Sequence, residues 1–388
     1  MSNPKRIVVK IGSSLLANTE LLTPRWAFIQ RLLDDVQVLR ERGHEVLLCS
    51  SGAVALGLKT IGERPETAGL RDKQAAAACG MPVLLNAYKQ VAHEFGFDIA
   101  QVLVTLRDLE DRRRFLNTKN TTHRLLEAGI VPIVNENDSI TTEEIRVGDN
   151  DRLAAKVAQM VQAETLVILT SVDGLYDRDP SEEGAQLVET VDDVTEYLEV
   201  TEGVSSLGTG GMLTKMQAAN MAQNAGCTTL IGNGETDDRP LLSLIDGERR
   251  HTRCIAHTRP DSAWTAWLTD RLQMAGSIVV SQKAIDAMCR KERGVRRGDI
   301  QSIQGTFVKG DVIHIYDESG AERARGLANF TAEETMILAR NQDIPAKQLL
   351  GYQTAATLVS RDNLVVLEDR HILWDNPPED RLESVSSN

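Results

Sequence analysis

Short apolar runs alternate with longer amphipathic stretches through the first two thirds of the chain. The apolar runs predict buried strands at 7–11, 46–49, 102–104, 131–134, 166–169 and 229–231. The helical spacing of apolar positions predicts helices at 24–42, 73–95, 117–128, 150–162 and 212–225. Short buried strands that alternate with helices are typical of a mainly parallel sheet covered on both faces. We therefore expect an α/β ligand-binding domain over residues 1–255.

The pattern changes after this region. Residues 256–275 predict a linker that contains a helix. Beyond the linker, Gly and Asp turns separate short predicted strands at 277–280, 299–303, 310–316 and 325–330. We expect a small β-rich domain over 276–353, followed by a C-terminal extension over 354–388.

Polar or glycine-rich turns directly follow five of the predicted strands. They are Gly12–Ser14, Ser50–Gly52, Asn135–Asp138, Thr170–Ser171 and Gly232–Gly234. Open parallel sheets bind their ligands beyond the carboxyl ends of the strands, where such turns gather. The sequence therefore predicts a binding site at this edge of the sheet.

Lys10 interrupts the first apolar run just before that run ends. A charged group is rarely buried without a partner, so we expect Lys10 to extend past the end of the strand towards an anion. The alternative is a lysine at the sheet edge whose ammonium group reaches solvent. The strand alone leaves both interpretations open.

A glycine-rich segment at 208–215 is a second candidate for anion binding. Its three glycines let the backbone pass close to an anion, and the helix predicted from Met212 directs amide groups and its positive end towards the same place. Lys215 adds a mobile positive charge that suits phosphate. The segment is not a Walker A motif, and no dinucleotide-binding GxGxxG follows the first strand.

Two lysines near one site suit phosphoryl transfer, which needs positioning and positive charge more than covalent help from the protein. Lys10 and Lys215 can flank the transferred group from opposite sides. An acidic residue is then needed to hold them, and the segment Asp149-Asn150-Asp151 supplies candidates where a helix begins. The alternative for this segment is a helix N-cap, a position where Asp and Asn are favoured in any case.

Six collinear segments and the β-rich region carry a resemblance to a known family. The segments are RIVVKIGSSLL, LLCSSGAVALG, IVNENDS, RVGDNDRLAAKVA, LTSVDGLYD and GTGGMLTKMQAA. They resemble the glutamate kinases of the amino acid kinase family. Residues 276–352, with GVRRGDI, GTFVKGDVIHIYD and ARGLANF, are similar to the small PUA barrel domain that many bacterial members carry.

This resemblance implies a reaction and a set of partners. The reaction is ATP-dependent phosphorylation of the glutamate side-chain carboxylate to glutamyl 5-phosphate, the first step of proline biosynthesis. The resemblance also implies Mg²⁺ with ATP as co-substrate, inhibition by proline, and a homo-oligomer, either a dimer or a tetramer.

The resemblance further assigns roles to individual residues. Lys10 and Lys215 correspond to catalytic lysines that stabilise the phosphoryl group, and Asp151 corresponds to the carboxylate that orients them. The glutamate-binding positions correspond to Ser50, Gly52, Asn135, Asp138 and Asn150. The nucleotide-binding positions correspond to Lys10, Thr170, Ser171, Thr209, Gly210, Gly211, Met212, Leu213, Thr214 and Lys215. The metal ligands stay unassigned.

Three positions bear on details of this expectation. Many family members carry an acidic residue where this chain has Ser171, so nucleotide affinity or metal placement is expected to differ here. Asp138 can accept from the ammonium group of a free amino acid. Another acceptor, such as aspartate, an N-acylated glutamate or a carbamate, stays open. Cys49 is expected to be a buried thiol rather than a nucleophile, because no matched motif contains a catalytic histidine.

Composition and charge narrow the class of protein. A net charge of -13 argues against nucleic-acid binding by the whole chain. RNA binding by the C-terminal domain stays a minority alternative, because 290–297 holds five basic residues while 276–352 has a net charge of only +1. Five scattered cysteines without a CxxC pair indicate reduced thiols in the cytoplasm. No apolar run predicts a membrane span, and the N-terminus lacks a signal-peptide pattern.

Overall fold

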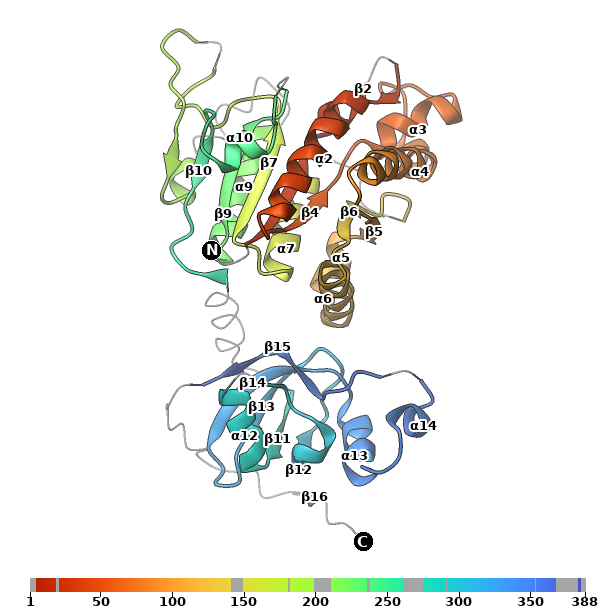
Figure 1. The fold of residues 1–388 in the computed structure, drawn as a ribbon, viewed down its shortest axis with the longest axis vertical. Helices are drawn as coiled ribbons and strands as arrows, with labels where there is room; N and C mark the ends of the chain where they lie inside the picture. The colour runs from red at the N-terminus through yellow and green to blue at the C-terminus, as the bar shows by residue number, and fades with distance from the viewer. Residues whose placement is uncertain are drawn as a thin grey trace. The chain divides into compact units, whose positions relative to one another are not determined.

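The computed structural model forms two compact units, Met1–Ala263 and Trp264–Asn388 (Figure 1). It describes residues 5–18, 21–140, 149–180, 182–198, 211–235, 238–260, 275–290, 292–352, 354–367 and 383–384. Most of the expected linker, at 261–274, and most of the C-terminal extension lie outside the described residues. Each unit has its own sheet and hydrophobic core. Within the described ranges, no helix is both long enough and apolar enough to cross a membrane.

The first unit is built on an eight-stranded sheet of order β5-β6-β4-β1-β7-β9-β10-β8. In this order the strands are Ile99–Val104, Val131–Glu136, Glu45–Cys49, Arg6–Ile11, Thr165–Thr170, Thr228–Asn233, Thr252–Cys254 and Thr190–Val191. Neighbouring strands are parallel, except that β9 and β10 are antiparallel. The predicted mainly parallel sheet is therefore confirmed, and all six predicted strands are present.

Helices cover both faces of this sheet. On one face lie α2 (Trp26–Glu41) and α4 (Leu70–Glu94), and on the other lie α7 (Asp149–Met160) and α9 (Gly211–Asn224). Within β1, Val9 packs into the core between the sheet and helices α2 and α4, and Val8 packs into the core between the sheet and helices α7 and α9. The two differ because successive strand side chains point to opposite faces. The same alternation puts Lys10 on the face covered by α7 and α9.

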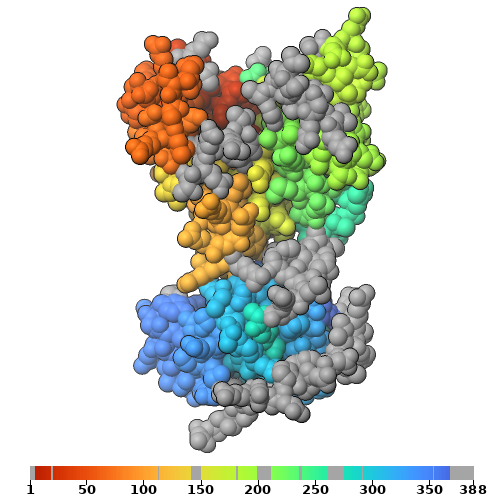
Figure 2. Space-filling model, turned by 180° about the vertical axis from the view of Figure 1, so that it is seen from behind, coloured from red at the N-terminus to blue at the C-terminus, as the bar shows by residue number. Residues whose placement is uncertain are grey.

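The remaining elements of the first unit are short or lie near the sheet edges. They are α1 (Ser13–Leu16), β2 (Ala17–Asn18), β3 (Thr23–Pro24), α3 (Ala53–Ile61), α5 (Leu106–Glu110), α6 (Arg112–Glu127) and α10 (Leu242–Ile245). Helices α3 and α4 lie side by side and form one lobe of the surface, which is orange in Figure 2. The sequence pattern does not predict α3, a short helix that is interrupted by Gly57, a residue of low helix propensity.

The second unit contains a six-stranded sheet of order β15-β14-β13-β11-β12-β16. In this order the strands are Val359–Val366, Glu322–Ala328, Val312–Tyr316, Gly276–Val280, Ile300–Gly305 and Glu383–Ser384. Its helices include α12 (Gln282–Cys289), α13 (Ala332–Arg340) and α14 (Ala346–Leu350). The predicted β-rich character is confirmed. The sequence pattern does not predict the helices, nor strand β15, which pairs antiparallel with β14.

Candidate active site

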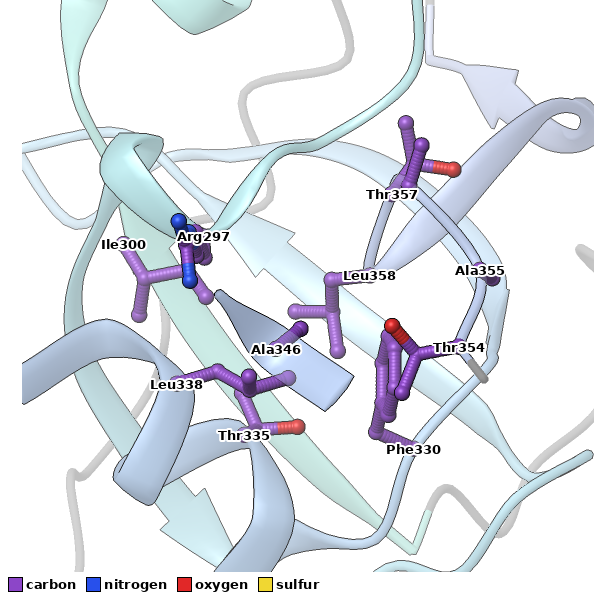
Figure 3. A pocket seen from close by; sticks show the side chains of 11 residues that line it. Arg297, Ile300, Phe330, Thr335, Leu338, Ala346, Thr354, Ala355, Thr357 and Leu358 are labelled. Carbon is purple, nitrogen blue, oxygen red and sulfur yellow. The ribbon is translucent and has the colours of Figure 1, made fainter. Parts of the chain in front are cut away.

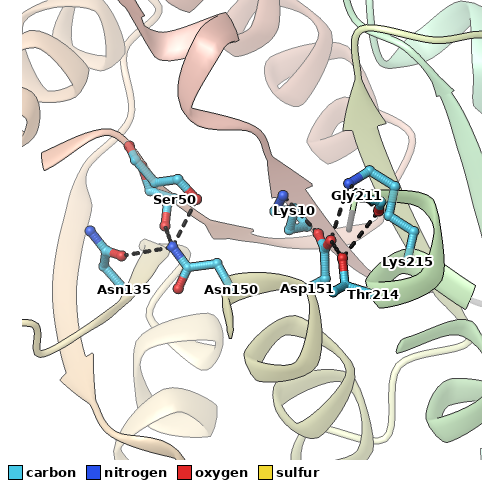
Figure 4. Close-up of polar contacts among 9 residues, drawn as sticks. Lys10, Ser50, Asn135, Asn150, Asp151, Gly211, Thr214 and Lys215 are labelled. Atoms are coloured by element: carbon cyan, nitrogen blue, oxygen red, sulfur yellow. Dashed lines mark hydrogen bonds and ion pairs between the residues drawn. The ribbon is translucent and has the colours of Figure 1, made fainter. Parts of the chain in front are cut away.

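Two lysines and one aspartate meet where β1, α7 and α9 come together (Figure 4). Lys10 Nζ lies 2.7 Å from Asp151 Oδ1, and Lys215 Nζ lies 3.1 Å from Asp151 Oδ2. Lys10 is the penultimate residue of β1, Asp151 lies in the first turn of α7, and Lys215 lies near the start of α9. One carboxylate therefore holds two ammonium groups, one on each oxygen. The alternative of a solvent-reaching Lys10 does not hold, because its exposed fraction is 6%.

This lysine–aspartate cluster is almost fully buried. Asp151 has an exposed fraction of 0% and Lys215 of 8%. Burial alone raises the pKa of Asp151, but Lys10 and Lys215 bring that pKa below its ordinary value, so the carboxyl is ionised at neutral pH. Burial lowers the pKa of Lys215, and Asp151 opposes that shift. With both lysines protonated, the cluster carries one net positive charge, which suits an anionic ligand.

The first turn of α9 supports the same carboxylate. Thr214 Oγ1 donates to Asp151 Oδ2 at 3.0 Å, and Lys215 Nζ donates to the Gly211 carbonyl at 3.1 Å. The other described residues of this turn, Met212 and Leu213, are half-buried. The described part of the glycine-rich segment therefore begins a helix beside the lysine–aspartate cluster. Of the expected nucleotide contacts, the structure leaves two outside the described residues, Thr209 and Gly210.

A second polar cluster lies beside the first and is joined to it through α7 (Figure 4). Asn150 Nδ2 donates to Ser51 Oγ at 2.8 Å and to the Ser50 carbonyl at 3.0 Å, and it lies 3.5 Å from Asn135 Oδ1. Asn150 directly precedes Asp151, so the start of α7 contacts both clusters. The structure thus brings together three residues expected to bind an acceptor: Ser50, Asn135 and Asn150. We call Ser50, Ser51, Asn135 and Asn150 the amide–hydroxyl cluster.

Several polar groups of this region are buried. Ser50 and Asn135 have exposed fractions of 1% and 3%. Asn150 Oδ1 is buried and has no hydrogen-bond partner among the described residues. Asp138, in the turn after β6, is also buried. Gly52, just before α3, has a φ of 91°, a backbone conformation that favours glycine. A buried acceptor without a partner is an arrangement that suits a polar ligand.

The turn after β7 lies at the same edge of the sheet. In the parallel pairing of β1 with β7, Ile11 is opposite Leu169, so Thr170 and Ser171 lie beside the turn that follows β1. The Leu169 carbonyl accepts from the Gly12 amide at 3.2 Å, which ties the two turns together. Thr170 is half-buried and Ser171 is exposed. The segments that follow β1 and β7 therefore lie side by side, as the prediction requires of this pair.

The sequence does not single out three residues of this region: Ser51, a member of the amide–hydroxyl cluster, and Met81 and Tyr88, which contact it. Asn135 Nδ2 donates to Met81 Sδ at 3.3 Å, and the Tyr88 hydroxyl lies 3.2 Å from Ser50 Oγ. Met81 and Tyr88 are two helical turns apart, so they project from the same side of α4. Ser51 lies in a turn that the sequence did mark as polar. Nothing in the apolar pattern of α4 marks the other two.

The described residues contain no group of three or more His, Cys, Asp or Glu side chains that could bind a metal. Both oxygens of Asp151 face lysines. A divalent cation that accompanies a nucleotide would therefore depend mainly on phosphate oxygens, a mode that Mg²⁺ commonly adopts. Cys49 is buried, and burial raises the pKa of its thiol to about 12, so it is not a thiolate nucleophile at neutral pH.

A pocket of about 220 Å³ lies in the second unit (Figure 3). Its lining residues are distant in sequence from the lysine–aspartate cluster and differ from it in chemistry. Apolar side chains such as Phe330 and Leu338 line it together with threonine hydroxyls. Its one charged lining residue, Arg297, donates to the Ile344 carbonyl at 2.6 Å. This pocket offers no paired cations for a phosphoryl group. The chemistry of the side chains, rather than cavity volume, therefore identifies the candidate active site in the first unit.

Comparison with known proteins agrees with this geometry. The sequence matches the amino acid kinase family over residues 5–233 and the PUA domain over residues 276–348. It is 40% identical to the glutamate 5-kinase of Azoarcus sp. (strain BH72) over 370 residues, which cover 94% of this chain and 99% of that protein. It is 39% identical to the glutamate 5-kinase of Burkholderia mallei (strain SAVP1), over 95% of this chain and 99% of that protein. The chain is therefore a kinase that belongs to the amino acid kinase family and carries a C-terminal PUA domain.

Proposed function

We propose that this kinase transfers the γ-phosphoryl group of ATP to the side-chain carboxylate of glutamate. The observation that carries the proposal is the buried pair of lysines on Asp151, beside the amide–hydroxyl cluster. Relatives named glutamate 5-kinase align with 94% of this chain, which supports glutamate as the acceptor. The products are glutamyl 5-phosphate and ADP. In this proposal the reaction is the first step of proline biosynthesis, and the enzyme is cytoplasmic.

The residues of the lysine–aspartate cluster fit this chemistry. A carboxylate oxygen of glutamate forms a bond to the γ-phosphorus, while the bond from that phosphorus to the β–γ bridging oxygen breaks and ADP leaves. Lys10 and Lys215 supply positive charge to the oxygens of the group in transfer. Asp151 holds both lysine side chains in place through one ion pair to each. No general base is needed, because the acceptor carboxylate is already ionised at neutral pH.

The amide–hydroxyl cluster fits the acceptor. Ser50, Asn135 and Asn150 can donate to carboxylate oxygens. Asn150 Oδ1 and Asp138 can accept from the α-ammonium group of a free amino acid, which argues against N-acylated acids.

The nucleotide and the regulatory partners complete the proposal. ATP binds with Mg²⁺. Its contacts come from Lys10, Lys215, the first turn of α9, and Thr170 and Ser171 at the end of β7. We also infer inhibition by proline and assembly into a dimer or tetramer, because both accompany the glutamate 5-kinase resemblance.

The first test is ADP release from ATP and Mg²⁺ with a panel of acids. Glutamate should be turned over faster than aspartate or N-acetylglutamate, and proline should inhibit. Lys10→Ala and Lys215→Ala should each lower kcat by about 100-fold or more, because each removes charge that stabilises the transition state. Lys59→Ala, an exposed lysine of α3, is the control and should match the unmodified chain. Faster turnover of aspartate, or active lysine variants, would refute the proposal.

A further inference from the structure

The hydroxyl of Tyr88 in helix α4 contacts Ser50 Oγ, and the function proposed above gives Tyr88 no role. We infer that Tyr88 is a positioning residue that donates a hydrogen bond to Ser50 and so orients the Ser50 hydroxyl as a donor to the acceptor carboxylate. This inference rests on the proposed function, in which Ser50 contacts the acceptor. It adds a residue of α4 to an acceptor site otherwise built from the end of β6, the turns that follow β4 and β6, and the start of α7.

The direction of the Tyr88–Ser50 hydrogen bond follows from burial. The Tyr88 hydroxyl lies 3.2 Å from Ser50 Oγ, and Tyr88 has an exposed fraction of 0%. Ser50 Oγ is the one hydrogen-bond partner of this hydroxyl within the described residues. A buried O–H group without an acceptor is unfavourable, so Tyr88 is the donor of the pair. Burial also raises the pKa of Tyr88, so the proton that it donates is retained at neutral pH.

The consequence for Ser50 is a hydroxyl whose proton is available. Ser50 Oγ accepts from Tyr88, and its other polar contact is the Ser51 carbonyl at 3.5 Å, the limit of a hydrogen bond. A ligand oxygen at ordinary hydrogen-bond distance is a better acceptor than that carbonyl. The chain of donors, Tyr88 to Ser50 to ligand, selects a carboxylate over an ammonium group at this point, and each bond strengthens the next.

Helix α4 holds Tyr88 close to the turn that contains Ser50. A Cβ added to Gly80 of α4 would lie 1.8 Å from the Ala53 carbonyl, three residues after Ser50, so the two backbones are in direct contact. Met81 of the same helix accepts a hydrogen bond from Asn135 Nδ2, in another residue of the amide–hydroxyl cluster. Two side chains from one face of α4 therefore support two acceptor-binding residues.

Tyr88→Phe tests the inference because it removes only the hydroxyl. The KM for glutamate should rise by about 5- to 30-fold, the loss typical of one buried hydrogen bond in a binding site. The KM for ATP and the unfolding temperature should stay close to those of the unmodified chain. Tyr316→Phe, which changes a buried tyrosine of the second unit, is the matched control and should leave both KM values unchanged.

A double-mutant cycle with Ser50→Ala separates positioning from a general structural effect. If Tyr88 acts through Ser50, adding Tyr88→Phe to the Ser50→Ala variant should not raise the KM for glutamate any further. Additive effects of the two substitutions, an unchanged KM for glutamate in Tyr88→Phe, or an equal rise in the KM for ATP would each overturn the inference.

The proposed function can fail independently of the role of Tyr88. If another acid is the preferred acceptor, the same cycle is measured with that acid. The KM for that acid then decides whether Tyr88 acts through Ser50. If glutamate is turned over but the cycle is additive, only the inference about Tyr88 fails. If no acid is turned over, both fail.

Discussion

Asp151 connects the two lysines of the candidate site, and its surroundings explain why all three residues act together. Its carboxylate is fully buried, each oxygen faces one ammonium group, and Thr214 donates a further hydrogen bond. A buried carboxylate without such partners is costly, and two buried ammonium groups without it repel each other. The effects of substitution in this cluster should therefore be strongly non-additive.

Asp151→Asn should change both the kcat of the kinase reaction and the dependence of kcat on pH. Asparagine keeps the shape but removes the negative charge, so kcat should fall by about 100-fold or more. Burial and Lys10 lower the pKa of Lys215 while Asp151 raises it. Without Asp151 that pKa falls further, so the alkaline limb of kcat, measured from about pH 6 to about pH 10, should move to lower pH.

Asp35→Asn is the matched control for this profile. Asp35 is also fully buried, but its Oδ2 accepts from the backbone amides of Leu241 and Leu242, away from both clusters. Asparagine can still accept these bonds. The pH profile of kcat for the control should therefore overlay that of the unmodified chain. A shifted alkaline limb in the control would count against assigning that limb to Lys215.

At the residue scale, the sequence marks charged groups more clearly than neutral ones. Lys10 stands out because it interrupts an apolar strand, and Lys215 stands out because it follows a glycine-rich segment. Tyr88 and Met81 do not stand out, because an aromatic residue and a methionine on the buried face of a helix are normal core residues. Their contacts with Ser50 and Asn135 depend on how α4 packs, which local sequence does not specify.

The contact between helices α3 and α4 places the turn Ser50–Gly52, which we propose binds the acceptor. Helix α3 begins directly after Gly52, so it continues the chain from Ser50 and Ser51. A Cβ at Gly57 of α3 would lie 1.8 Å from the Ala76 carbonyl of α4, and one at Gly80 would lie equally close to Ala53. These glycines allow the two helix backbones to touch, and so fix the position of the turn relative to α4.

Gly80→Ala should therefore reduce both stability and acceptor binding. The added methyl group has to displace backbone, which costs about 1–3 kcal/mol in the free energy of unfolding. The displaced start of α3 should raise the KM for glutamate more than the KM for ATP. Urea unfolding and steady-state kinetics measure the two effects. Gly69→Ala, where a Cβ would meet Asp72 Oδ2 at an ordinary 3.5 Å, is the control. A fully stable Gly80→Ala would contradict the packing argument.

At the element scale, sequence patterning predicts the sheet better than the helices. The six predicted strands of the first unit are observed because buried parallel strands are continuous apolar runs. Helix α4 begins at Leu70 rather than at the predicted residue 73, and α6 begins at Arg112 rather than at 117. The missed starts contain charged residues, Arg71 and Asp72 in α4 and three consecutive arginines from Arg112 in α6, which an apolar pattern overlooks. In the second unit, Asn363 lies buried within β15 and interrupts the alternation expected of a strand.

At the scale of the whole molecule, the two units depend on different electrostatics. The first unit buries a cluster with excess positive charge, whereas the second buries carboxylates that are paired with cations. Glu322 Oε1 accepts from Arg325 Nε at 2.6 Å and lies 2.6 Å from His314 Nδ1. Burial alone raises the pKa of Glu322, but His314 and Arg325 bring it down to about 2. Asp317, held by Ser319 and Arg323 against the same effect of burial, also has a pKa of about 2.

These depressed pKa values predict that the second unit loses stability in acid. Because the pKa of Glu322 is lower in the folded chain than its ordinary 4.5, its stabilisation is present above about pH 4.5 and is lost as the pH falls towards 2. Glu322→Gln should therefore cost ~2 kcal/mol at pH 7, and this difference should narrow at about pH 3. Peptide-resolved hydrogen exchange on the full chain measures it in β13 and β14, with β1 as the internal reference. Glu333→Gln, at an exposed position in α13, is the control. A pH-independent loss, or an equal loss in β1, would show that Glu322 does not act through its ionised carboxylate.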